Sequence, residues 1–196
     1  LERAAADTSK RSLNLGFGLL FLLAVWVFML FRASGDGFSI LAIAAIVGGY
    51  MAMNIGANDV ANNVGPAVGS KALTLLGALA IAAIFEAGGA LIAGGDVVMT
   101  ISKSIISPDT FADKSIFIWA MLAALLSAAV WVNLATLVGA PVSTSHSIVG
   151  GVMGAGIAAA GFASVDWAVM GKIATSWVIS PVLGGFVAAV FLLFIK

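Results

Sequence analysis

Long apolar runs alternate with short polar segments along this chain of 196 residues. After a polar stretch at residues 1–12, the run from Leu13 to Phe31 is close to the ~20 residues that a helix needs to cross a bilayer. The later apolar runs are 38–55, 73–95, 115–138 and 176–195. The pattern predicts about five membrane crossings. The glycine-rich run from Ile148 to Val165 is either a further crossing or a re-entrant element that dips into the membrane and returns.

The connecting segments carry turn signals. Arg32 to Gly37 is predicted to be a turn, because it combines glycines with small and charged residues. Asp96 to Lys114 alternates isoleucines with polar residues, which predicts an interfacial helix followed by a turn at Pro108. Ser180-Pro181 predicts a kink in the last span, and the Gly150-x-x-x-Gly154 pair is suited to close helix contact.

A polar segment from Asn54 to Ser70 interrupts the apolar pattern. Asp59 stands there after a long uncharged run, and a charge within a membrane costs ~2.5–3.5 kcal/mol on insertion scales. Four asparagines accompany it: Asn54, Asn58, Asn62 and Asn63. Helical spacing would gather these side chains on one side. The segment also contains helix-breaking residues, Gly56, Gly65, Pro66 and Gly69, which predict a broken membrane helix lining a cavity.

Composition places the chain in a membrane, because 62% of its residues are hydrophobic and only 9% are charged, against about 25% charged in soluble domains. The expected fold class is therefore an all-α, polytopic helical membrane protein of the cell (plasma or inner) membrane. The net charge is zero, so no electrostatic argument supports a nucleic-acid partner. The absence of cysteine excludes disulfides and thiolate catalysis.

Two acidic residues within the spans are candidates for cation chemistry. Asp59 and its asparagines offer carboxylate and carboxamide oxygens, which suit a hard cation such as sodium. The alternative is a hydrogen-bonding anchor that holds a helix kink together. Glu86 lies in the middle of another apolar run, where it could be a second cation ligand or a proton carrier. Alternatively, it is protonated or paired with Lys71 or Lys103.

A second polar cluster follows Pro141 and consists of Ser143, Thr144, Ser145, His146 and Ser147. Such residues cap the first turn of a helix. The same geometry makes an anion cradle, because free N–H groups and hydroxyls meet at the positive end of a helix. His146 is either a structural hydrogen-bonding group or a proton acceptor.

The charge distribution bears on which anion could bind. No arginine lies between Gly35 and the C-terminus. A bound anion would therefore be neutralised by helix N-termini, by lysines or by co-bound cations, which predicts cation-coupled uptake. Carboxylates favour phosphate over sulfate, because protonated phosphate can donate a hydrogen bond to them and sulfate cannot.

Three motifs resemble the inorganic phosphate transporter family: G-A-N-D-V-A-N from Gly56, G-A-P-V-S-T-S-H-S-I-V-G-G from Gly139, and K-I-x-x-S-W-x-x-S-P from Lys172. The resemblance implies a carrier of two inverted repeats. This chain would be its N-terminal half, with a polar tail at 1–12, an additional helix and turn at 13–37, and the first repeat at 38–196. The second repeat is absent here, and a second repeat or a second copy would complete the site.

The activity implied is cation-coupled symport of inorganic phosphate by alternating access, with sodium or protons as the coupling ion and no enzymatic reaction. Phosphate would be bound by Asn58, Asn62, Ser143, Thr144 and Ser145. The coupling ion would be bound by Asn58, Asp59 and Glu86. Further candidates are Asn54, Asn63, His146 and Ser180.

Three alternatives remain open on sequence alone. A permease of the same fold could carry sulfate or another oxyanion. An intramembrane hydrolase could use Ser143, Ser145 or Ser147 with His146, although residues so close in sequence rarely achieve the geometry that a nucleophile and its base need. A non-transporting subunit of a larger complex is the third alternative.

Overall fold

Long helices dominate the computed structural model, which describes residues 2–32 and 38–195. The long helices are α1 (Glu2–Arg32), α2 (Phe38–Gly69), α3 (Leu75–Met99), α4 (Lys114–Leu137), α5 (Thr144–Ala160) and α6 (Trp167–Ile195). Five of them, all except α5, are long and apolar enough to cross a membrane. The prediction of about five spans in an all-α fold is confirmed. The turn predicted at Arg32 to Gly37 falls on 33–37, outside the described residues.

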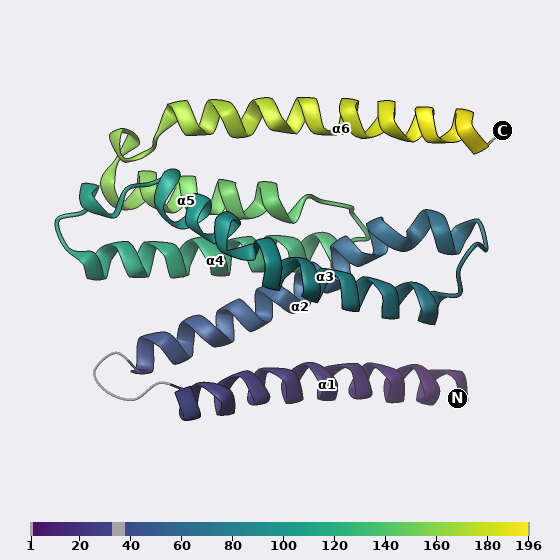
Figure 1. Ribbon diagram of the computed structural model, residues 1–196. Helices are drawn as coiled ribbons and strands as arrows, with labels where there is room; N and C mark the ends of the chain where they lie inside the picture. Colours follow the sequence, from purple (N-terminus) through teal and green to yellow (C-terminus); the bar gives the residue numbers. More distant parts are fainter. Residues whose placement is uncertain (1, 33–37, 196) are drawn as a thin grey trace.

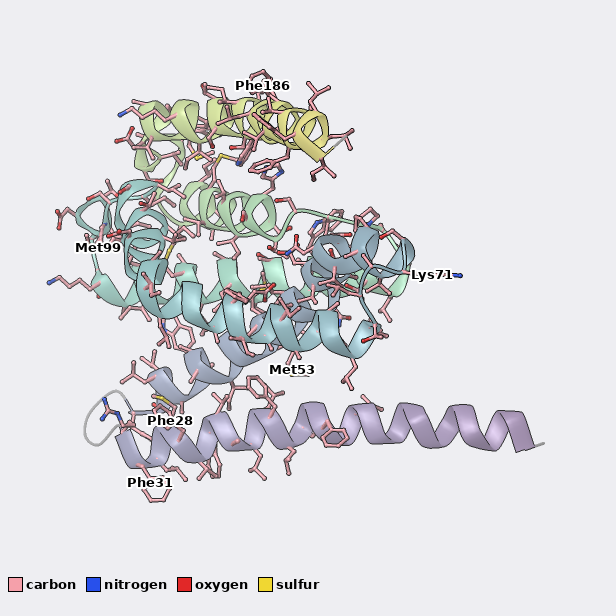
Figure 2. All side chains as sticks on the ribbon, turned by 45° about the vertical axis from the view of Figure 1, so that its right-hand side comes forward. Phe28, Phe31, Met53, Lys71, Met99 and Phe186 are labelled. Carbon is pink, nitrogen blue, oxygen red and sulfur yellow. The ribbon has the colours of Figure 1, made fainter. Side chains whose placement is uncertain are left out.

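The helices are arranged so that α1 and α6 lie on opposite outer sides and the others between them (Figure 1). α5 returns alongside α4, and α2 crosses this pair. Phe31 on α1 and Phe186 on α6 point away from the bundle (Figure 2), and both are largely exposed. Such apolar outer faces suit contact with lipid.

α2 is a single helix of 32 residues with Pro66 inside it, so the predicted break within Asn54 to Ser70 is wrong. In lipid the backbone has no water to bond with, and helical hydrogen bonding is kept even across glycine. Pro66 lies in the last turn of this helix, and the Ser70 N–H donates to the Pro66 carbonyl at 3.0 Å. The chain then turns through Lys71, whose φ of 62° is left-handed.

The helix predicted at Asp96 to Lys114 is present in part, because residues 96–104 are helical but continue α3 and do not form a separate helix. α3 continues to Met99, a π-helical turn η1 follows at Thr100–Ser104, and only a short 3-10 turn η2 at Pro108–Thr110 matches the predicted turn. Ile105 and Ile106 are fully buried. Ile106 forms an antiparallel bridge with Val165, so this connection is part of the core.

Close packing of α5 uses different glycines from the predicted pair. Nothing lies near a Cβ built on Gly150 or Gly154, whereas one on Gly151 would be 2.7 Å from the Ala124 carbonyl oxygen of α4. A Cβ on Gly156 would overlap the Ile106 side chain. The contact faces of α5 are therefore rotated from the predicted ones. The predicted kink at Ser180-Pro181 does not interrupt α6, which is helical through Pro181.

Candidate functional site

A helix begins inside the bundle where α4 ends and α5 starts. α4 ends at Leu137 and is followed by Gly139 with a left-handed φ of 71°, a conformation that glycine adopts without strain. Ser143 then caps α5, because its hydroxyl oxygen accepts the His146 N–H at 3.2 Å. The break predicted at Gly139 to Pro141 and the capping by Ser143 are both present in the structure.

Asn58 of α2 ties this linker to the middle of the bundle. Its carboxamide nitrogen donates to the Thr136 hydroxyl at 3.0 Å and to the Ala140 carbonyl at 3.3 Å. Its carboxamide oxygen accepts the Val142 N–H at 3.3 Å. Asn58 is only 6% exposed. Since a carbonyl oxygen has two lone pairs, one remains for a further partner.

Asp59, the next residue of α2, reaches the start of α5. The Thr144 hydroxyl donates to the Asp59 carboxylate at 2.5 Å, a length typical of a charge-assisted hydrogen bond. Thr144 is buried and Asp59 is half-buried. The two polar clusters singled out from the sequence therefore meet, and we call Asn58, Asp59, Thr136 and Thr144 the polar junction.

A pocket of about 340 Å³ opens beside the polar junction. Its walls come from α2 and from the end of α4 with its linker, and they are lined by Ala57, Asn58, Ala61, Asn62, Thr136, Gly139, Ala140 and Pro141. Asn62 is exposed, as are Ser143 and Ser145. These side chains are accessible to a ligand near the buried junction.

A second polar contact lies one helical turn before Asn58. Asn133 of α4 donates from its carboxamide nitrogen to the Asn54 carboxamide oxygen at 2.9 Å, and Asn54 donates to the Tyr50 carbonyl at 2.8 Å. Asn133 and Thr136 were not among the predicted site residues. The available signal was two polar residues three apart near the end of an apolar run, a spacing that places them on one helix face.

Other predicted residues lie apart from the junction. Glu86 is exposed and lines a separate pocket of about 400 Å³ between α2 and α3, together with Asn63. Ser180 is exposed on α6. The His146 ring packs against Trp177 of α6, with ring centroids 3.9 Å apart.

The serine cluster is engaged in helix capping. Ser143 accepts from the His146 backbone, and the Ser147 hydroxyl donates to the Ser143 carbonyl at 2.8 Å. The His146 side chain packs on an indole ring instead. This geometry does not favour the hydrolase alternative, which needs a hydroxyl bonded to the imidazole.

Comparison with known proteins agrees with this architecture. The model of the "Phosphate transporter family" matches residues 55–196. A Helicobacter pylori protein named "Putative phosphate permease" is 55% identical over all 196 residues of this chain, which cover 37% of the relative. A Thermococcus kodakarensis protein described in the same words is 47% identical over 148 residues, 76% of this chain and 36% of the relative.

A solved structure is also similar. "The sodium-dependent phosphate transporter" superposes with a TM-score of 0.72 at 46% identity, over 76% of this chain and 37% of that one. The family expected from the three motifs is confirmed. The chain thus spans little more than a third of the length of the curated relatives described here.

Proposed function

Since the chain belongs to the phosphate transporter family, we propose that it forms the N-terminal half of a cation-coupled symporter for inorganic phosphate, which works by alternating access in the cell membrane. Its five long apolar helices make it an integral membrane protein. A second repeat, or a second copy, would complete the site.

The coupling cation binds at Asp59 in this proposal. A carboxylate has about four lone-pair sites, and the Thr144 hydroxyl occupies one of them. The remaining sites, together with the carboxamide oxygens of Asn58 and Asn62, are ligands that suit sodium. The sodium dependence named for the similar solved structure supports sodium over protons. Glu86 would act apart from this site, in the α2–α3 pocket.

Phosphate binds at the start of α5 in the same proposal. The N-terminus of a helix attracts anions through its free N–H groups and its dipole. Ser143, Thr144 and Ser145 add hydroxyl groups there, and Asn58 and Asn62 line the adjoining pocket. With few cationic side chains in the spans, the bound cation supplies much of the charge that balances the anion.

The observation that carries the proposal is the hydrogen bond from Thr144 to Asp59. The bond supports the proposal because it joins Asp59, the proposed cation ligand, to the proposed anion-binding turn, so that occupancy of one would change the electrostatic potential at the other. Two opposite unit charges about 4 Å apart attract by about 4 kcal/mol at an effective dielectric constant of about 20. Coupling of this kind is what symport requires.

Uptake of labelled phosphate into proteoliposomes containing the full-length protein tests the proposal. Sodium and proton gradients are imposed separately, and we expect only the sodium gradient to drive accumulation. Unlabelled arsenate should compete, whereas sulfate at equal concentration should not. Accumulation under neither gradient would refute symport, and competition by sulfate but not arsenate would assign the site to sulfate.

A further inference from the structure

The first turn of α5 is held from two sides. On one side Thr144 bonds to Asp59 of α2. On the other, the His146 ring lies 3.9 Å from the Trp177 ring of α6, centroid to centroid, with 45° between the ring planes. His146 is only two residues from Thr144, and its own backbone N–H is bound by the capping serine. Movement of Trp177 would therefore be transmitted to the capped turn.

Trp177 is the last residue of α6 that packs against the core cluster. A stripe on the first half of α6 packs against the core cluster and consists of Val169, Met170, Ile173 and Trp177. From Val178 onward the described residues of α6 are exposed, except for the half-buried Val190. The contact between Trp177 and His146 is thus the last point along α6 at which it can influence α5.

We propose that Trp177 is a positioning residue for phosphate binding: its indole ring fixes His146, and through His146 the orientation of Ser143, Thr144 and Ser145. The inference rests on the proposed function, because it concerns the turn that would bind phosphate. Trp177 itself need not contact the anion. The aromatic pair restricts the rotation of a short capped turn, and anion binding depends on where that turn points.

Kinetics of the full-length protein in proteoliposomes test the role. Loss of the aromatic contact in Trp177→Ala should raise the phosphate KM between about twofold and about tenfold, the range that one aromatic pair accounts for, with kcat nearly unchanged. Trp177→Phe should restore most of the affinity. His146→Ala should raise the phosphate KM about as much as Trp177→Ala does. The KM of the double variant should be no higher than that of the single variant with the higher KM. Trp131→Ala, on an exposed part of α4, is the matched control.

A spectroscopic measurement separates this role from general packing. With 5-fluorotryptophan at the chain's five tryptophans, the Trp177 signal is identified by its absence in Trp177→Phe. We expect it to shift in His146→Ala and again when inorganic phosphate is added to the wild type.

Two outcomes would overturn the positioning role while leaving the transporter intact. In one, Trp177→Ala takes up phosphate at the wild-type rate with an unchanged phosphate KM. In the other, the fluorine signal of Trp177 does not shift when phosphate is added. A wild-type protein that takes up no phosphate would instead refute the proposed function itself, and this inference with it.

Discussion

The Thr144 hydroxyl donates a hydrogen bond of 2.5 Å to the Asp59 carboxylate, across 85 positions of sequence. This contact joins the second half of α2 to the first residue of α5, and it brings the only acidic side chain of α2 to the start of a helix.

Removal of the hydroxyl should weaken transport. Thr144→Val keeps the shape of the side chain but leaves the carboxylate without this donor. The hydrogen bond holds the Asp59 carboxylate in position, so we expect half-maximal uptake to require several-fold more sodium. The upper limit corresponds to the worth of a hydrogen bond to a charged group, about 1.5–3 kcal/mol. Sodium titration of phosphate uptake measures the change. Thr144→Ser, which keeps the donor, should stay near wild type, and equal behaviour of the two variants would contradict the contact.

The α4–α5 pair should be sensitive to one glycine and tolerant of its neighbour. In Gly151→Ala the new methyl group would meet the Ala124 carbonyl oxygen, and such overpacking typically costs about 1–3 kcal/mol. Gly150→Ala adds a methyl group into open space and improves helix propensity. Melting temperatures in detergent should fall only for Gly151→Ala. A larger loss for Gly150→Ala would mean that the described α4–α5 contact is wrong.

Because of the charged cap at the start of α4, the stability of the protein should fall as the pH becomes acidic. Asp113 precedes the helix and caps it, and hydrogen bonds from the Ser115 backbone N–H and hydroxyl lower the pKa of its carboxyl group. The ionised cap therefore stabilises the protein above the ordinary pKa of an aspartate, and this stabilisation is lost as pH falls through the lowered value. Asp113→Ala should melt below wild type at neutral pH, and the difference should close in strong acid. A difference that is independent of pH would contradict the role of the charge.

The sequence was sufficient to predict the features that follow from hydropathy and helix punctuation. Five apolar runs predicted five long helices, and Gly139 to Pro141 predicted the start of a helix inside the bundle. That the polar segment and the hydroxyl cluster meet was implied only by the family resemblance, which assigned phosphate to Asn58 and Asn62 together with Ser143, Thr144 and Ser145.

The remaining features depend on tertiary packing. Pro66 suggested a broken α2, but the sequence did not show that α2 ends at Gly69, which places Pro66 in its last turn. Gly150 and Gly154 matched a contact motif, yet helix rotation turned Gly151 toward α4. Asn133 and Thr136 are uncharged, so their presence in a span does not indicate a site. Only their hydrogen bonds with Asn54 and Asn58 in the structure identify them as part of it. The burial of the segment Asp96 to Lys114 could not be predicted, because Ile106 pairs with Val165, which is distant in sequence.

The proposed coupling between sodium and phosphate depends most on Asp59, and uptake by an Asp59 variant tests it most directly. Sodium-driven phosphate uptake is compared in proteoliposomes for the wild type, Asp59→Asn and the control Asp96→Asn, an exposed position near the end of α3. Asn keeps the side-chain shape and removes the charge that would hold the cation. We expect phosphate to accumulate with the wild type and the control, and none to accumulate with Asp59→Asn. Accumulation by Asp59→Asn at the wild-type rate would contradict it.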